Sequence, residues 1–489
     1  MNGIYLEGVI NSVNVLIIGA GEVGRNIAAT LSSENYNVYL VEQDEDAAKR
    51  ADEELDARVI TGNGARPQVL NQVFSEVADN DDGVIDIMIA CTNKDEVNML
   101  ACWIANSAGI KHIISRARNL EFTDSPDWAK KFGIELMISP ERSLAREILS
   151  LLTVSSAIHT AELLNGLAAL YAFKVEANSP FVGKNLMTIR QENPNLLAVF
   201  VYIQHENGEA LVPNGLSKIS ENDICYVVTF KETTFLLEEK FNPEIKNIRS
   251  LKKIFIVGGG KLGSQIAAAI KRDSGRVQLR LIEKDPLKCL KLSQELGEAL
   301  VLNADGADKN LLFEEGIDQA DGYVCATDSD ELNLIYSGLA KTMGVKKSIA
   351  VVRQKLYQDL TQYLPITIVD PNEALASSIL RVVHYSGHSR ALSIIKTINA
   401  EMLELEIPKD SALLGHTIAD LKIPKGVLIA LMQRNDKVML PTGFTVLMAG
   451  DYLILFASSE LMPQAVEFFN SKVPASNPDS NTQGSSDEI

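Results

Sequence analysis

The sequence predicts an α/β fold in which a doubly wound parallel sheet occurs twice along the chain, each copy followed by a small α+β lobe. Three observations support this prediction. Apolar runs alternate with helix-compatible segments, each half has one apolar run that ends in closely spaced glycines, and the features of the first half return in order in the second. Alternating β and α segments form parallel sheets, because the crossover helices cover the faces of the sheet.

Length and charge narrow the possible classes of protein. A chain of 489 residues is expected to form several domains. We find no apolar stretch approaching the roughly 18–20 residues that span a bilayer, and residues 1–11 lack the features of a signal peptide, so we expect a cytoplasmic protein. The net charge of −18 argues against a nucleic acid or an anionic membrane as the main partner.

The first predicted strand, residues 13–18, runs directly into a G-x-G-x-x-G pattern and a helix-compatible segment. The first glycine permits a tight turn, the second lets the backbone approach a pyrophosphate, and the third allows close packing of helix on strand. The N-terminus of the helix offers free N–H groups to phosphate oxygens. The pattern is therefore typical of a Rossmann nucleotide site, with expected contacts at Gly19, Gly21, Glu22, Val23 and Gly24.

The second predicted strand, residues 38–42, ends in Glu42, whose carboxylate can accept hydrogen bonds from an adenosine ribose. A carboxylate at this position disfavours a 2′-phosphate, so NAD(H) or an adenine nucleotide is preferred over NADP. The alternative is that Glu42 only caps the end of its strand.

Three later strands end in polar residues on the same edge of the sheet. Asn63 follows the third strand, where a loop would pass the adenine, and Thr92 follows the fourth. Arg116 ends the fifth strand and could meet terminal phosphates, although an arginine here could equally form an ion pair. Ligands of open α/β sheets bind at this carboxyl edge.

The same features recur from residue 253 onward, and the two sites need not bind alike, because Asp305 takes the place of Asn63. We match Val351-Val352-Arg353 with Ser115-Arg116, so Arg353 is expected to end the fifth strand of the second sheet. Lys261 adds a positive charge to the second glycine loop. The expected contacts in this copy are Gly258, Gly260, Lys261, Leu262, Gly263, Glu283, Asp305, Thr327 and Arg353.

The repeat continues into the small lobes, where Ser179–Lys184 corresponds to Ser411–His416, and a Pro-x-Gly turn follows in both. Residues 471–489 are rich in Ser, Pro, Asn and Asp, so we expect a disordered tail. The predicted division is 12–140 (first Rossmann domain), 141–235 (long helix and small lobe), 250–371 (second Rossmann domain), 372–470 (long helix and small lobe) and 471–489 (tail).

The chain lacks a recognisable catalytic set. The small lobes contain few residues that could act as a general acid or base, and the five cysteines are interpreted as buried thiols. His384 and His388 have helical spacing but no acidic companion, so no metal site is expected. We therefore predict a nucleotide sensor and no enzyme. The alternatives are an NAD-dependent oxidoreductase with duplicated Rossmann domains, or an adaptor for another partner.

The ordered set of motifs resembles the tandem KTN/RCK regulatory subunits of bacterial Trk potassium uptake systems. The resemblance rests on the glycine loop, residues 92–98, Ser139-Pro140-Glu141, residues 179–184 and Pro213-Asn214-Gly215, together with their duplication. It implies a peripheral protein on the cytoplasmic face of the membrane that forms a gating ring, a homotetramer, beneath a TrkH-like potassium channel or transporter subunit. NAD(H), ATP or ADP in the Rossmann lobes would then control ion flow.

Overall fold

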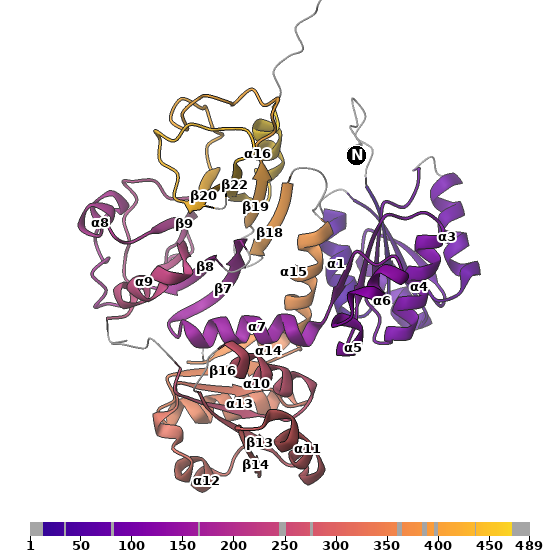
Figure 1. Ribbon diagram of the computed structural model, residues 1–489, viewed down its shortest axis with the longest axis horizontal. Helices are drawn as coiled ribbons and strands as arrows, with labels where there is room; N and C mark the ends of the chain where they lie inside the picture. The colour runs from indigo at the N-terminus through magenta and orange to yellow at the C-terminus, as the bar shows by residue number, and fades with distance from the viewer. Residues whose placement is uncertain are drawn as a thin grey trace, which may run out of the picture.

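The computed structural model of the chain contains four lobes, two Rossmann lobes and two small lobes (Figure 1). The lobes are joined by long helices that cross near the centre of the molecule. Every structural statement below concerns the residues that the structure describes, which are 13–33, 36–79, 83–164, 167–243, 251–273, 277–358, 364–383, 389–395, 400–435 and 437–471.

The first Rossmann lobe is a six-stranded parallel sheet with strand order β3-β2-β1-β4-β5-β6. Its strands are β1 (Asn14–Ile18), β2 (Asn37–Glu42), β3 (Arg58–Thr61), β4 (Ile87–Ala90), β5 (His112–Arg116) and β6 (Leu136–Ile138). Its helices are α1 (Glu22–Ser33), α2 (Glu45–Glu54), α3 (Pro67–Asp79), α4 (Asp95–Ser107), α5 (Leu120–Thr123) and α6 (Pro126–Lys131).

The second Rossmann lobe repeats this topology in the order β14-β13-β12-β15-β16-β17, again with parallel pairing. Its strands are β12 (Lys253–Val257), β13 (Gln278–Glu283), β14 (Leu300–Asn303), β15 (Gly322–Cys325), β16 (Lys347–Val351) and β17 (Thr367–Val369). Its helices are α10 (Lys261–Asp273), α11 (Pro286–Leu296), α12 (Lys309–Glu314), α13 (Asp330–Thr342) and α14 (Lys355–Gln358). The predicted fold class, a duplicated doubly wound parallel sheet, is confirmed.

The central strands read as continuous apolar runs because helices cover both faces of each sheet. All five residues of β1 are buried. On one face, Val15 and Ile17 pack with α1, and on the other, Leu16 and Ile18 pack with α3 and α4. This burial orients the carboxyl ends of the strands, and thus the glycine loops, toward one edge of each sheet.

The two halves exchange their long helices. Helix α7 (Pro140–Thr153) leaves the first Rossmann lobe but packs its apolar side against β12 and α10 of the second. Helix α15 (Pro371–Val383) leaves the second lobe and packs against α1 of the first, and the two helices also contact each other (Figure 1). Each Rossmann core is therefore completed by a helix from the other half.

Each small lobe is a five-stranded sheet, and the two sheets share an apolar interface. Strand β8 shows the period of two: Tyr171 and Phe173 face the lobe's own core, whereas Leu170 and Ala172 face the other lobe. The first lobe comprises β7 (Ala157–Leu163), β8 (Ala168–Lys174), α8 (Leu186–Glu192), β9 (Ala198–Gln204), β10 (Ala210–Leu211), β11 (Ile224–Phe230) and α9 (Thr234–Phe241). The second lobe comprises β18 (Ser389–Ile395), β19 (Ala400–Glu406), β20 (Leu428–Arg434), β21 (Lys437–Met439), β22 (Tyr452–Ser458) and α16 (Met462–Phe469).

Some sequence predictions fall outside the described residues. His384 and His388, and the tail from residue 472 onward, are among them. Within the described ranges, no helix combines the length and the apolarity needed to cross a membrane. The same ranges contain no cluster of three His, Cys, Asp or Glu residues suited to a metal ion.

Candidate nucleotide sites

The two glycine loops have the same backbone geometry. Gly19 and Gly258 adopt φ values of +106° and +103°, a region that residues with a side chain rarely occupy. A Cβ atom at Gly24 would lie 1.9 Å from the carbonyl oxygen of Gly19, so only glycine lets α1 pack this closely on its strand. Gly263 makes the same approach to Gly258 in the second copy.

Gly21 and Gly260 differ from the other glycines of the two loops because a Cβ atom on either would meet no atom within 4 Å. Neither residue needs a left-handed conformation, so the fold does not require glycine at these positions. The open space in front of them is where a pyrophosphate would approach the backbone N–H groups of α1 and α10. The residues present therefore fit a nucleotide diphosphate in both lobes.

Val23 and Leu262 lie in the first turns of these helices with their side chains buried. Only their backbone could therefore serve a ligand. Glu22 projects from the loop, and its carboxylate accepts a hydrogen bond from the side-chain amide of Asn372, the second residue of α15, at 2.7 Å. Burial, the largest influence, raises the pKa of Glu22. Lys261, at the position equivalent to Glu22, is exposed.

The acids that end the second strands hold the glycine loops. Glu42 accepts the backbone N–H of Ala20 at 2.6 Å, and Glu283 accepts that of Gly259 at 2.7 Å. Each carboxylate also accepts the N–H two residues further along its own chain, at 2.9 Å. The expected capping alternative is thus present in the structure. A carboxylate can accept about four hydrogen bonds, so the same groups could still bind a ribose.

The loops after the third strands differ between the copies. The side chain of Asn63 accepts only the N–H of Ala65, at 2.9 Å, among its described contacts. Asp305 accepts hydrogen bonds from the equivalent N–H of Ala307 and from the hydroxyl of Tyr336, the latter at 3.0 Å. It also forms an ion pair with Lys284 at 3.0 Å. The backbone N–H and Lys284 together lower the pKa of Asp305. The second copy therefore fixes this loop with charge where the first does not.

Thr92 and Thr327 are positioned by buried asparagines that the sequence did not single out as site residues. Thr92 donates its hydroxyl to the side-chain oxygen of Asn98 at 2.6 Å, and the Asn98 amide donates to the carbonyl of Arg116 at 3.1 Å. In the second copy Asn333 makes the same bonds to Thr327, at 2.6 Å, and to Val351, at 2.8 Å. The asparagines join the ends of two neighbouring strands at the ligand edge.

These bonds correct the predicted match between the arginines. Because Asn98 binds the carbonyl of Arg116 and Asn333 that of Val351, the equivalent of Arg116 is Val351. Strand β16 ends at Val351, so Arg353 lies two residues beyond it and does not end the strand as expected. The true counterpart of Arg353 is Arg118, since both donate their backbone N–H groups to the acid that opens the preceding helix, Asp330 of α13 and Asp95 of α4.

Arg116 and Arg118 lie side by side at the edge of the first sheet. Arg116 donates to the side chain of Asn93 at 3.1 Å, and Arg118 approaches the carboxylate of Glu141 at 3.5 Å. The Nε atoms of both arginines are buried; that of Arg118 is the atom paired with Glu141, whereas that of Arg116 makes no hydrogen bond within the described residues. Burial lowers the pKa of Arg116. Unpaired buried donors are costly, so this edge is suited to an anion.

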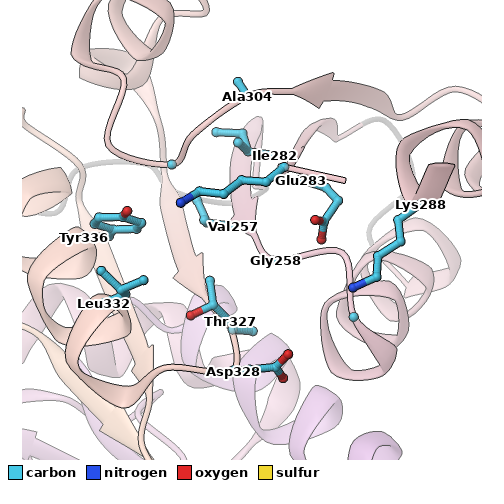
Figure 2. A pocket seen from close by; sticks show the side chains of 14 residues that line it. Val257, Gly258, Ile282, Glu283, Lys288, Ala304, Thr327, Asp328, Leu332 and Tyr336 are labelled. Atoms are coloured by element: carbon cyan, nitrogen blue, oxygen red, sulfur yellow. The ribbon is translucent and has the colours of Figure 1, made fainter. Parts of the chain in front are cut away.

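A cavity of about 170 Å³ lies at the carboxyl edge of the second sheet. Figure 2 shows Glu283 and Lys288 on one side, Leu332 and Tyr336 on the other, and Thr327 and Asp328 below. Of the site residues expected in this copy, the cavity brings together Gly258, Gly260, Glu283 and Thr327, while Lys261, Leu262, Gly263, Asp305 and Arg353 do not line it.

Comparison with known proteins supports the duplication. The TrkA-N domain family matches residues 15–140 and again 254–390, and the TrkA-C domain family matches 402–470. A Trk system potassium uptake protein TrkA homolog of Methanosarcina mazei is 34% identical over 94% of this chain and 100% of its own. TrkA of Halomonas elongata is 30% identical over 93% and 98% of the two chains.

Solved structures share the fold at lower identity. The GsuK RCK domain matches with a TM-score of 0.56 and 20% identity over 93% of this chain and 95% of its own. The GsuK channel bound to NAD gives the same score and identity over 93% and 79% of the two chains. Fold and glycine loops thus define a tandem Rossmann protein of the TrkA-N and TrkA-C class. The chain belongs to the TrkA family of Trk system potassium uptake proteins.

Proposed function

We propose that this chain is the cytosolic, nucleotide-sensing regulatory subunit of a Trk-type potassium uptake system. It would bind NAD(H), ATP or ADP in its Rossmann lobes and control a TrkH-like channel or transporter subunit at the inner face of the membrane. The observation that carries the proposal is the pair of glycine-loop sites whose lobes are joined crosswise by α7 and α15. Family membership supplies the potassium system as the setting.

The exchanged helices give a route from ligand to shape. Helix α1 carries the N–H groups that would bind a pyrophosphate, and the N-terminus of α15 is tied to it through Glu22 and Asn372. Helix α15 continues toward β18 of the second small lobe. A ligand that repositions α1 would therefore act on the second small lobe, and a ligand at α10 would act through α7 on the first.

Exposed apolar residues recur at equivalent places on the two Rossmann lobes. Leu100 and Trp103 on α4 are 42% and 50% exposed, and Ile335 on α13 is 62% exposed. Leu100 and Ile335 are equivalent positions, each five residues after the acid that opens its helix. Copies of the chain could associate through these faces, and we propose that they form the homotetrameric ring that the resemblance implies.

The proposal excludes catalysis by the chain alone. His205, the best placed histidine in a small lobe, is not a free surface residue: its Nδ1 lies 2.9 Å from the carboxylate of Asp223. Asp223 also accepts the N–H of Ser220, so this pair fastens a loop of the small sheet. Nucleotides would thus be bound as signals and not consumed.

The test is potassium uptake in cells that carry the membrane subunit with variants of this chain. Gly21→Asp together with Gly260→Asp places carboxylates in the two open spaces, so nucleotide binding and the nucleotide response should both be lost. Ala29→Asp with Ala268→Asp is the matched control, because these exposed positions are equivalent on α1 and α10 and add the same charge. Uptake that is indifferent to the chain, or unchanged binding in the Gly21/Gly260 variant, would refute the proposal.

A further inference from the structure

The corrected match between the two sheets allows the two sites to be compared position by position. Asp95 and Asp330 accept the backbone N–H groups that follow the fifth strand, and Asn98 and Asn333 bind the last carbonyl of that strand. With these anchors aligned, Arg116 corresponds to Val351, Asn93 to Asp328 and Lys94 to Ser329. Each of these differences makes the first edge more positive than the second.

The first edge contains an unused donor for an anion. The Nε of Arg116 is buried without a hydrogen-bond partner among the described residues. The Nε of Arg118 is also buried, but it forms an ion pair with Glu141 at 3.5 Å. A terminal phosphate, which is the β-phosphate of ADP or the γ-phosphate of ATP, carries free anionic oxygens that a dinucleotide lacks, and it would accept from the Arg116 guanidinium in charge-assisted hydrogen bonds.

At the second edge, the described residues offer no equivalent unpaired donor for an anion. Val351 is fully buried and apolar, and the guanidinium of Arg353 lies 3.2 Å from the carboxylate of Asp330 and donates to the carbonyl of Thr327. The exposed carboxylate of Asp328 lines the cavity (Figure 2). A terminal phosphate would be repelled by this carboxylate, whereas a ribosyl nicotinamide, which is cationic in NAD⁺ and neutral in NADH, would not.

The opposite end of the second site carries the positive charges. Lys284 and Lys288 line the cavity, and their equivalents in the first copy are Gln43 and Ala47. The ammonium of Lys288 points toward the loop that begins at Gly258 (Figure 2), and within the described chain no acceptor pairs with it. Lys284 is already paired with Asp305, so Lys288 supplies the available charge, at the adenosine and pyrophosphate positions that mononucleotide and dinucleotide ligands share.

The charged residues of the glycine loops, Glu22 and Lys261, do not change the difference in charge between the two ligand edges. Glu22 replaces Lys261, but its carboxylate is turned to Asn372 of α15. Lys261 lies at the first turn of α10, where it would meet the pyrophosphate that both classes of ligand contain. The ligands differ instead in the charge of the terminal phosphate, which would meet Arg116 in the first site and the uncharged Val351 in the second.

We propose that the first Rossmann site takes an adenosine polyphosphate, ADP or ATP, and that the second takes the dinucleotide NAD(H). The assignment rests on the proposed function as a nucleotide sensor and adds which ligand each site selects. Arg116 is the specificity-determining residue of the first site, because its Nε is a buried donor without a partner in the described chain and its counterpart in the second site is Val351. Val351 and Asp328 exclude that phosphate from the second.

Titration calorimetry on the full chain separates the sites. Gly260→Asp leaves the first site alone and should bind ADP and ATP at least about 10-fold more tightly than NADH. Gly21→Asp leaves the second site alone and should show the reverse order. The factor corresponds to one charge-assisted hydrogen bond gained or lost. Equal preferences in the two variants would overturn the assignment but leave the sensor proposal intact, whereas no binding by the parent chain would defeat the sensor proposal itself.

Exchanging equivalent residues tests the cause. In the Gly260→Asp chain, Arg116→Val should weaken ATP binding by about 10–100-fold and change AMP binding by less than about 3-fold, because AMP has no terminal phosphate to lose. In the Gly21→Asp chain, Asp328→Asn changes an exposed side chain to the residue of the first copy and should strengthen ADP binding several-fold. Equal losses for ATP and AMP, or no gain from Asp328→Asn, would refute the roles given to these residues.

Discussion

The amino edges of the two Rossmann sheets show how a repeated sequence acquires unequal surroundings. His112 opens β5 with its side chain about half exposed, and it pairs with Glu135 at 2.9 Å. Lys347 opens β16 at the equivalent position, yet it is only 6% exposed and donates to the carbonyl of Ala157 in β7 at 2.6 Å. The first small lobe therefore covers the second sheet, while the residue that opens β5 remains accessible.

The second Rossmann lobe thus has a contact at its amino edge that the described residues do not show for the first. It contacts the first half through α7 and also through β7, and the side chain of Leu152 on α7 reaches Gly322 in β15. A Cβ atom at Gly322 would lie 2.4 Å from that leucine. Equivalent positions of the two sheets thus differ in their surroundings where the second sheet contacts the first half of the chain.

The largest expected effect tests the exchange of helices. Ile148 on α7 and Ile379 on α15 are equivalent and fully buried, the first in the core of the second Rossmann lobe and the second in the core of the first. Replacing either by alanine should cost about 2–5 kcal/mol through lost burial and a cavity. Ile148→Ala should therefore increase amide hydrogen exchange in β12, and Ile379→Ala in β1. Faster exchange confined to the half that carries the substitution would refute the crosswise packing.

The sequence predicted the fold because its signals are local. The glycines before α1 and α10 and the apolar strands that precede them fix the turn, the parallel pairing and the strand order. The exchange of α7 and α15 could not be predicted, since an apolar helix face fits either Rossmann core. The strand β7 was also missed as an element, because its apolar residues face another lobe.

The glycines, acids and threonines of both copies lie at the strand ends where the sequence placed them, and their role in binding stays a prediction. The arginines were matched two residues out of register, because the residue equivalent to Arg116 is Val351 and Arg353 is the next basic residue in the chain. Hydrogen bonds from Asn98 and Asn333 settle the alignment. The sequence contained the same signal, because the D-E-x-N motifs at residues 95–98 and 330–333 continue without a gap to residues 116 and 351.

Lys347 and His112 differ in burial, so they should contribute differently to the pH dependence of stability. Burial lowers the pKa of Lys347 to about 8, with Lys341 adding to the decrease and Glu238 opposing it. In the unfolded chain the pKa of this lysine is near 10.5, so between pH 8 and 10.5 the unfolded state binds more protons than the folded state. The free energy of unfolding should therefore rise with pH through this window, by on the order of 3 kcal/mol from Lys347.

Lys347→Met removes the ionisable group and should flatten this rise, which chemical denaturation at several pH values would measure as the difference between variant and parent. The difference cancels the titration of tyrosines and cysteines, which both chains share. His112→Met is the matched control at the exposed equivalent position and should leave the alkaline slope as it is. A Lys347→Met chain that keeps the full slope would show that the lysine is not enclosed between the lobes.

The smallest expected effect compares the two small lobes. Asp223 and Asp451 are equivalent buried acids, each 1% exposed, but their partners differ. Asp451 receives two hydrogen bonds from Arg434, both at 2.6 Å, whereas Asp223 receives one from His205 at 2.9 Å. Arg434→Gln should cost about 1.5–3 kcal/mol, because it leaves a buried carboxylate with weaker partners, and His205→Gln about 1 kcal/mol or less, because the amide replaces the single donor. Hydrogen exchange in β22 and β11 would measure the two losses separately, and a larger loss in β11 would reverse the order of anchoring that these contacts imply.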